Sequence, residues 1–259
     1  MSITFKYTKI LDSNGETIAY GKIKGLGRLN LLSKNVLTNM VRDLTICFQK
    51  TGIRCVVLEG DGIDAFIGGA HLEDLRSLSP DTARIFIGRI HEVCDLIRHA
   101  EVPVVAAMRG YCLGAGLEIA ASCDFRYGDA SVKCGMPEVR VGVPSVVEAA
   151  MLPGLVGWGK AKELMLRGHI VDSNESLKIG ILQQLFNKDE LSEKVKAICD
   201  DMILGGQNAI SKQKKLFRYW EDNNLSRSIQ ESIQIFSQTY SQDEPKIMIS
   251  NFFQNKEKS

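Results

Sequence analysis

Short apolar runs alternate with longer segments of helical periodicity in this chain, and this order constrains the fold more than any other feature. Residues 55–60 (CVVLEG) and 102–110 (VPVVAAMRG) are typical of buried strands. Helical spacing predicts one helix capped by Ser33 before the first of these strands and another over residues 82–99 between them. The alternation predicts an α/β fold with a parallel sheet, in which sites gather where strand ends lead through glycine-rich turns into helices.

The pattern changes at residue 189, after which the sequence predicts helices without intervening strands. Four amphipathic segments follow: DELSEKVKAICDDMIL, NAISKQKKLFRYWED, SRSIQESIQIFSQTYS and EPKIMISNFFQ. Their apolar faces cannot all be buried on a sheet that ends earlier in the chain. We therefore divide the chain into a core over residues 1–188 and a helical region over residues 189–259 that packs on the core or on a neighbouring subunit. Three lysines of this region are interpreted as a solvated helix face: Lys212, Lys214 and Lys215.

The charge balance argues against a partner recognised by overall charge. With 32 basic and 31 acidic side chains, the formal net charge of +1 creates no field that would attract nucleic acid or an anionic membrane. No apolar run reaches the ~20 residues that a membrane-spanning helix needs. The first 25 residues alternate like two strands around a turn at residues 13–15 and lack the apolar core of a signal peptide. Because the ending NKEKS is not a peroxisomal address, we expect a cytoplasmic protein.

Seven cysteines are scattered through the chain without a C-x-x-C pair, and most lie inside apolar runs. An odd number without metal-ligand spacing is typical of core thiols rather than of a disulfide or zinc framework. We therefore expect reduced, buried cysteines.

Two glycine-rich segments pass from an extended stretch into a helix: residues 65–75 (AFIGGAHLEDL) and residues 111–120 (YCLGAGLEIA). The first N–H groups of a helix have no backbone partner, so each turn would present free donors. Two such donors that converge on one carbonyl oxygen form an oxyanion hole, and glycine or alanine would let a substrate lie close to them. Taken singly, each segment is more typical of a common packing turn. Neither has the glycine pattern of a dinucleotide site or of a phosphate loop.

Three glutamates stand in apolar surroundings. Glu118 lies in a segment, residues 111–124, whose small apolar residues predict a buried helix. Burial would raise the pKa of Glu118 toward the range useful for proton transfer; the alternatives are a solvated residue and a core salt bridge. Glu138 follows Pro137, and this rigid setting suits a general acid or base, with a turn carboxylate that accepts backbone hydrogen bonds as the alternative. Glu148 is interpreted as a structural or pocket-wall group.

Four blocks of the sequence, taken in order, resemble the crotonase superfamily and, within it, the enoyl-CoA hydratase branch. The blocks are AFIGGAHLEDL, VPVVAAMRGYCLGAGLEIAASCDFRYGDAS, MPEVRVGVPS and the helical carboxyl end. The similarity is dense from residue 65 to residue 180 and loose in the first strands and last helices. It implies a crotonase spiral of ββα units with a C-terminal helical trimerisation region. It also implies a homo-oligomer, either a trimer or a dimer of trimers.

The resemblance also implies the chemistry. Members of the family bind acyl-coenzyme A thioesters with the carbonyl between two backbone N–H groups, and the matching positions here are Ala70 and Ala115. The two glutamates of hydratases match Glu118 and Glu138. The pair implies reversible syn addition of water across the 2,3 double bond of an enoyl-CoA thioester. No metal or redox cofactor is implied, because the thioester and the oxyanion hole supply the electron sink.

Several positions depart from the family's pattern. His71 stands where hydratases usually carry aspartate, and it either contacts the thioester or has a structural partner at the helix start. Glu73 replaces a basic residue that often serves the phosphates, which moves that role to a group such as Lys256 of a neighbouring subunit. Ser145 and Val146, together with Glu148, would reshape the acyl pocket. The candidate substrate or coenzyme A contacts are Arg28, Leu29, Gly68, His71, Leu72, Gly114, Ser145 and Lys256.

Two other classes of function stay open. Another crotonase reaction, such as double-bond isomerisation or a biosynthetic dehydration, would use the same thioester site. An isomerase needs only one proton shuttle, so replacement of Glu118 would leave much of its activity. A scaffold or RNA-binding protein is the alternative outside enzymes, and the charge balance and the intact glutamate pair count against it.

Overall fold

The computed structural model describes residues 1–9 and 15–256, and for residues 255 and 256 it describes the backbone alone. The predicted turn at residues 13–15 therefore lies largely outside the described residues. Within these ranges the strands form two sheets. The larger sheet has the order β1-β2-β3-β5-β7-β10 and consists of β1 (Ile3–Lys9), β2 (Thr17–Ile23), β3 (Ile53–Gly60), β5 (Val104–Met108), β7 (Phe125–Gly128) and β10 (Gln184–Leu185). The smaller sheet has the order β4-β6-β8-β9 and consists of β4 (Ala65–Ile67), β6 (Tyr111–Leu113), β8 (Lys133–Gly135) and β9 (Ile170–Asp172).

The helices confirm most of the predicted ones. They are α1 (Lys34–Phe48), α2 (Leu72–Arg76), α3 (Pro80–His99), α4 (Ala115–Ser122), α5 (Leu152–Arg167), α6 (Ser173–Lys178), α7 (Leu191–Met202), α8 (Gln207–Asp222), α9 (Leu225–Thr239) and α10 (Glu244–Lys256), with the 3₁₀ turns η1 (Glu138–Val141) and η2 (Val147–Met151). Ser33 caps α1, as predicted, by accepting a hydrogen bond from the Val36 N–H. The predicted helix over residues 111–124 is wrong at its start, because residues 111–113 form β6 and the helix begins only after Gly114.

Successive segments of the chain add one strand to the large sheet and one strand to the small sheet, and most of them then form a helix. β3 joins the large sheet, β4 joins the small sheet, and α2 and α3 follow. β5, β6 and α4 repeat this order, and β7, β8 and η1 repeat it again. Strands β2, β3, β5 and β7 are parallel neighbours in the large sheet. The predicted α/β fold, a spiral of ββα units around a parallel sheet, is therefore confirmed.

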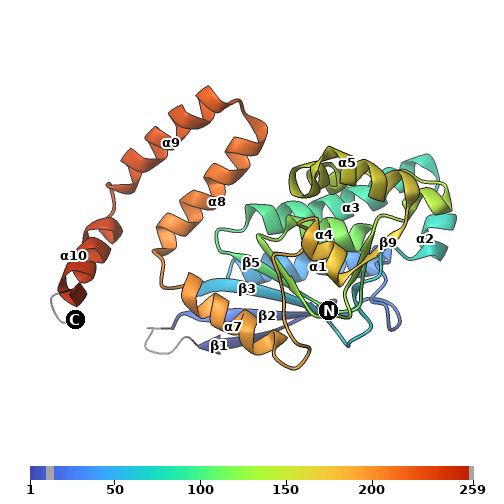
Figure 1. Cartoon of the computed structure of the whole chain (residues 1–259), viewed down its shortest axis with the longest axis horizontal. Coiled ribbons are helices and arrows are strands. Elements are labelled where there is room, and N and C mark those ends of the chain that lie inside the picture. The colour runs from blue at the N-terminus through green and yellow to red at the C-terminus, as the bar shows by residue number, and fades with distance from the viewer. Residues whose placement is uncertain (10–14, 257–259) are drawn as a thin grey trace.

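Helices cover both faces of the large sheet, because its central strands are apolar on both sides. Val56 and Leu58 of β3 belong to the core that contains α1 and α3. Cys55 and Val57 of the same strand belong to the core that contains α7. Figure 1 shows α7 on one side of this sheet and α1 and α3 on the other. The side of α1 and α3 is the one that also carries the small sheet and α4.

The C-terminal helices differ in how they contact the core. α7 packs on the large sheet, whereas α8 reaches the core through polar groups: the Lys214 ammonium forms an ion pair with Asp124, and Arg98 pairs with Glu221. Lys214 is only 6 % exposed, so its interpretation as part of a solvated helix face is wrong. Figure 1 shows α8, α9 and α10 leading away from the two sheets toward the left of the view.

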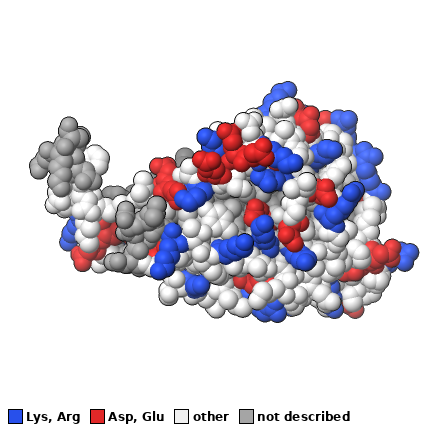
Figure 2. All heavy atoms as spheres, turned by 90° about the horizontal axis from the view of Figure 1, so that it is seen from below, with Lys and Arg blue, Asp and Glu red and all other residues white. Residues whose placement is uncertain are grey.

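Three further observations concern the surface charge, the cysteines and the lengths of the helices. On the face shown in Figure 2, basic and acidic side chains are interspersed. All seven cysteines are buried and free, as predicted. In the part of the chain that the structure describes, no helix combines the length and apolarity needed to cross a membrane.

Candidate active site

The first glycine turn connects β4 to α2 and leaves one backbone donor free. Ala70 forms a parallel bridge with Leu32, in which the Leu32 N–H donates to Gly69 O and the His71 N–H donates to Leu32 O, each at 2.9 Å. The central residue of such a bridge directs its own N–H away from the partner. Within the described residues the Ala70 N–H has no backbone acceptor. Gly69 is required here, since its φ is +106° and a Cβ would lie 3.1 Å from Leu113 O.

The second glycine turn connects β6 to α4. Gly114 has φ 51° and ψ −123°, a conformation that glycine adopts far more readily than other residues. Its carbonyl accepts the N–H groups of Leu117 at 2.7 Å and of Glu118 at 3.0 Å. Ala115 occupies the first position of the helix, where an N–H has no partner in the helix itself. This N–H also finds no backbone acceptor elsewhere in the described ranges.

The small sheet brings the two turns and one further segment to the same place. β4 pairs in parallel with β6, and β6 pairs in parallel with β8. The carboxyl ends of these three strands therefore meet at one edge. Ala70 follows β4, Ala115 follows β6 and Glu138 follows β8. All three residues line one cavity of about 620 Å³.

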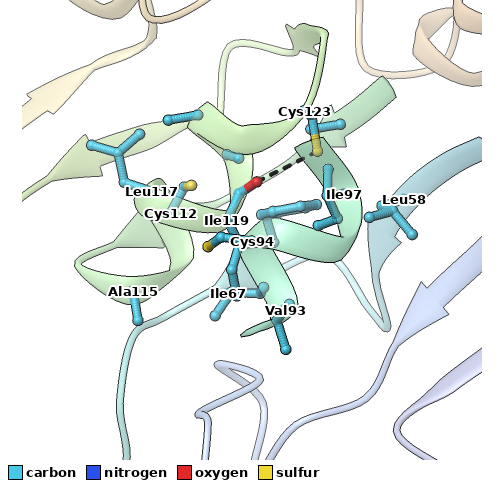
Figure 3. Close-up of a cluster of buried hydrophobic side chains, with 14 of the residues drawn as sticks. Leu58, Ile67, Val93, Cys94, Ile97, Cys112, Ala115, Leu117, Ile119 and Cys123 are labelled. Atoms are coloured by element: carbon cyan, nitrogen blue, oxygen red, sulfur yellow. Dashed lines mark hydrogen bonds between the residues drawn. The ribbon is translucent and has the colours of Figure 1, made fainter. Parts of the chain in front are cut away.

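Glu118 is a buried carboxylate on α4, and its side chain is only 3 % exposed. The helix around it is apolar: Figure 3 shows its neighbours Leu117 and Ile119 within a cluster that includes Cys94 of α3. The Glu118 Oε1 accepts a hydrogen bond from the Ala149 N–H of η2 at 3.2 Å. The carboxylate also lines the cavity, so it is enclosed by apolar groups on one side and open to a ligand on the other.

Glu138 begins η1 directly after Pro137, half-buried at the cavity wall. Its Oε2 accepts a hydrogen bond from the Ser145 hydroxyl at 3.0 Å. Its Oε1 lies against Gly114, where an added Cβ would clash with this oxygen. Gly114 thus has two functions in the local structure, because it turns the chain into α4 and leaves room for the Glu138 carboxylate.

The two acids of the cavity have raised pKa values. Burial and then the negative charge of Glu138 are the largest effects that raise the pKa of Glu118 from 4.5 to about 8. The Ala149 N–H acts in the opposite direction, and Glu148 adds a smaller increase. Burial also raises the pKa of Glu138, against the hydrogen bond from Ser145. Like charges in a poorly solvated cavity resist simultaneous ionisation, so the pair favours a state with one proton.

The cavity contains most of the residues that the sequence singled out. They are Leu29, Gly68, Ala70, Leu72, Gly114, Ala115, Glu118 and Glu138. Val146 also lines the cavity, whereas Ser145 contacts it only through Glu138.

Three other candidates, Arg28, His71 and Glu148, do not line the cavity, and nothing is described of the side chain of a fourth, Lys256. Arg28 is exposed and is not among the residues that line it. His71 has the structural partner that was one of its two interpretations, since its Nδ1 lies 3.0 Å from Asp74 Oδ1. Glu148 is buried beside His91. Lys256 ends α10, and its side chain lies outside the described residues.

Sequence reasoning missed two parts of the site. The first is its apolar wall, to which α3 contributes Ile87 and Ile90, and the loop after η1 contributes Val143. The spacing of the two isoleucines indicated an apolar helix face, but a face toward the core has the same pattern. The second is the contact between His91 and Glu148, which are 57 positions apart and carry no shared motif. Among the described residues, no group of three or more His, Cys, Asp or Glu side chains could hold a metal ion.

Comparisons with known proteins show the family to which the chain is similar. A family model described as enoyl-CoA hydratase/isomerase matches residues 13–259. Crotonyl-CoA hydratase of Syntrophomonas wolfei is 28 % identical over 251 residues, which cover 96 % of this chain and 96 % of that protein. Short-chain-enoyl-CoA hydratase of Clostridium acetobutylicum is 26 % identical over 248 residues, which cover 95 % of each protein.

Solved structures show the same fold. The enoyl-CoA hydratase from Bacillus anthracis superposes with a TM-score of 0.91 at 23 % identity, covering 98 % of this chain and 97 % of that one. The match of the family model over nearly the whole sequence, on a chain with this fold, decides the assignment. The chain belongs to the enoyl-CoA hydratase/isomerase family of the crotonase superfamily.

Proposed function

We propose that this protein is an enoyl-CoA hydratase, which adds water reversibly and with syn geometry across the 2,3 double bond of a short-chain enoyl-CoA thioester. The observation that carries the proposal is the meeting of Glu118 and Glu138 with the free N–H groups of Ala70 and Ala115 in one cavity. The two relatives that match nearly the whole chain are a crotonyl-CoA hydratase and a short-chain-enoyl-CoA hydratase, which supports a short acyl chain.

The two free N–H groups are proposed to form the oxyanion hole. The N–H groups of Ala70 and Ala115 would donate to the thioester oxygen, which polarises the conjugated double bond and stabilises the enolate that forms after attack. Removal of one donor of this type costs roughly 3 kcal/mol of transition-state stabilisation. Both donors belong to backbone turns next to glycines, so they are held in place before the substrate binds.

The two glutamates are proposed to divide the proton transfers. Glu118 would position a water molecule and accept its proton as the hydroxyl bonds to C3. The reactive form of the singly protonated pair would be the one with its proton on Glu138, which would give this proton to C2, so that the elements of one water molecule are added. Transfer of a proton from Glu118 to Glu138 then restores the starting state. No electrons are exchanged with a cofactor in this scheme, so we propose that the reaction needs no metal or redox group. Each acid–base role should contribute on the order of 10²–10⁴ in rate.

We also propose that the protein is a homo-oligomer, a trimer or a dimer of trimers. Support comes from α9 and its C-cap residue Tyr240, which expose an apolar stripe with helical spacing in the single chain: Leu225, Ile229, Ile233, Phe236 and Tyr240. Burial of such a stripe against another copy would remove it from water.

The test is the decay of the conjugated enoyl-thioester absorbance when the protein is mixed with crotonyl-CoA. We expect rapid decay with the wild type and a fall in kcat of about 10²–10⁴ in Glu118→Gln and in Glu138→Gln. Glu163→Gln is the matched control, because this carboxylate pairs with Lys160 and Arg167 on α5 and does not line the cavity. It should keep the wild-type rate.

The possible outcomes separate the competing functions. If Glu118→Gln kept most of its activity while Glu138→Gln lost it, an isomerase with one proton shuttle would replace the hydratase. If the wild type bound coenzyme A esters but did not hydrate crotonyl-CoA, the short-chain assignment would be wrong, and longer and branched enoyl thioesters would be tried next. Failure with that whole panel would refute the hydratase proposal.

A further inference from the structure

A third acid lies buried next to the proposed site and takes no part in the scheme above. Glu148 is 4 % exposed, and its Oε1 lies 2.8 Å from His91 Nδ1 of α3. Its Oε2 is also buried and has no hydrogen-bond partner within the described ranges. A buried carboxylate with an unpaired oxygen is costly, so its presence here calls for an explanation. His91 is 55 % exposed, and it connects this buried acid to solvent.

The η2 turn, which carries Glu148, also forms a hydrogen bond with Glu118 of α4. The next residue, Ala149, donates its N–H to Glu118 Oε1 at 3.2 Å, and this is the hydrogen bond that fixes the orientation of that carboxylate. The residue before, Val147, has φ +41°, a conformation that is strained for a β-branched side chain. Such a conformation persists only where the surroundings enforce it, and it is typical of functional sites. Movement of Glu148 would therefore also move the donor to Glu118.

The titratable groups near Glu148 belong to the elements around η2. From α3 they are His91 and Cys94, from α4 Glu118, and η1 adds Glu138 next to Glu118. The negative charge of Glu148 raises the pKa of both Glu118 and Cys94. The charged side chains of α5 contact other groups of their own surface: Lys160, Lys162, Glu163 and Arg167.

We propose that Glu148 and His91 form a positioning pair for the active site, in which their contact holds the η2 turn in place and the Ala149 N–H of this turn holds the Glu118 carboxylate. The inference rests on the proposed function, because it assigns Glu118 the role of proton acceptor. Neither residue lines the cavity, so neither contacts the substrate. The pair acts on the reaction only through Glu118, and the exposed face of His91 is its contact with solvent.

The first test is the pH dependence of kcat/KM for crotonyl-CoA. Glu118 must be ionised to accept a proton while Glu138 keeps one, so kcat/KM rises with pH through the lower pKa of the Glu118–Glu138 pair in the free enzyme. Glu148→Gln removes a negative charge without a change of shape, which lowers that pKa. The acidic limb of the profile should therefore move to lower pH. Glu92→Gln removes the same charge from the residue next to His91, where the carboxylate pairs with Arg89, and should leave the limb in place.

His91 is tested together with Glu148. His91→Leu removes the hydrogen-bond partner of Glu148, so that η2 can shift and its Ala149 N–H holds Glu118 less well. Because that hydrogen bond lowers the pKa of Glu118, the acidic limb should move to higher pH, whereas His91→Gln, whose amide can still donate to Glu148, should keep the wild-type profile. In the double variant His91→Leu, Glu148→Gln, the limb should match that of Glu148→Gln alone, because His91 acts only through the Glu148 carboxylate. A further shift in the double variant, or lower rates in the single variants without any change of the profile, would overturn the proposal and leave a purely structural role.

A readout that does not need turnover separates this inference from the proposed function. The carboxylic-acid band of protonated Glu118 can be followed by infrared spectroscopy against pH, identified by its loss in Glu118→Gln. We expect the same order of midpoints, with Glu148→Gln below the wild type and His91→Leu above it. If no thioester is hydrated but the midpoints move in this way, the proposed function is wrong and the positioning pair stands. If Glu148→Gln does not fold, His91→Leu at the half-exposed position decides alone, and an unmoved midpoint refutes the pair.

Discussion

Gly114 occupies a position at which one added methyl group would displace the Glu138 carboxylate from the site. The space beside its Cα is filled by the Glu138 carboxylate, and its positive φ turns β6 into α4. The second oxyanion donor, Ala115, follows directly. A change at Gly114 would therefore displace an acid and strain the turn, while the cavity wall formed by other elements would remain.

We predict that Gly114→Ala lowers kcat by about 10²-fold or more, because the new methyl group takes the place of the Glu138 carboxylate. Binding of a coenzyme A ester, measured by calorimetry, should change much less. Gly157→Ala is the control, since Gly157 also has a positive φ of 76° but has no atom within 4 Å of an added Cβ. Wild-type turnover by Gly114→Ala would show that Glu138 is not needed at this position.

The Glu118 carboxyl gives a second prediction, for stability against pH. Its pKa is about 8 in the folded protein against an ordinary 4.5, so the folded chain binds this proton more tightly than the unfolded chain does. Stability therefore falls as pH rises from the lower value to the higher one, at about 1.4 kcal/mol for each unit that separates the two pKa values. Glu118→Gln should melt above the wild type at pH 8 and close to it at pH 5. Equal differences at both pH values, seen by calorimetry, would contradict a raised pKa.

The candidate acids could be predicted where the neighbouring positions in the sequence define their surroundings. Glu118 stands within a run of small apolar residues and Glu138 stands behind a proline, and both settings are visible in a few positions of sequence. Lys214 could not be predicted as buried, because its partner Asp124 lies 90 positions away, just before β7. The partner of Glu148 was missed for the same reason.

Among the elements, α3 has the widest influence on the site. Its residues Ile87 and Ile90 line the cavity, and His91 contacts η2. The helix starts at a capping box, in which Ser79 Oγ accepts the Thr82 N–H at 3.3 Å and Thr82 Oγ1 accepts the Ser79 N–H at 2.7 Å. The capping box thus stabilises the first turn of the helix that carries these two wall residues.

Removal of the cap should cost stability but not activity. Ser79→Ala loses one of the two reciprocal hydrogen bonds, so we expect the free energy of unfolding to fall by about 1 kcal/mol in denaturant titrations. Ser77→Ala, which removes an exposed hydroxyl that donates to Asp74 O, should stay within about 0.5 kcal/mol of the wild type. A loss as large in the control would mean that the capping box has no special role.

Element boundaries were harder to predict than element types. The apolar run at residues 111–124 predicts burial correctly, yet periodicity could not reveal that three residues of it form a strand before the helix starts. The turns η1 and η2 contain four and five residues, which is too few for a helical pattern to emerge. Both turns hold acids of the site, so the elements hardest to predict are those nearest the proposed chemistry.

At the scale of the molecule, the C-terminal helices are only partly attached to the rest of the single chain. α7 covers the large sheet and α8 is tied to the core by the buried ion pair of Lys214 with Asp124. α9 contacts α8, and its stripe residues Ile233 and Phe236 are 59 % and 67 % exposed. The proposed oligomer would bury this stripe.

We predict that Ile233→Glu combined with Phe236→Glu lowers the molar mass in light scattering from that of an oligomer to 28.7 kDa. Charges placed within an apolar contact would be desolvated without partners. Gln234→Glu adds a charge to the same helix beside the stripe rather than within it and should leave the mass unchanged. A monomeric wild type would contradict the proposed assembly.

The contact between Gly114 and Glu138 also bears on how such a protein can evolve. Glycine and alanine codons differ by a single nucleotide, so one mutation is enough to exclude the Glu138 carboxylate from its position. The Ala70 turn and the apolar wall do not depend on that carboxylate, and they would be inherited intact. A lineage could thus pass in one step from a two-acid site to a thioester binder with one acid, from which selection could develop a different reaction.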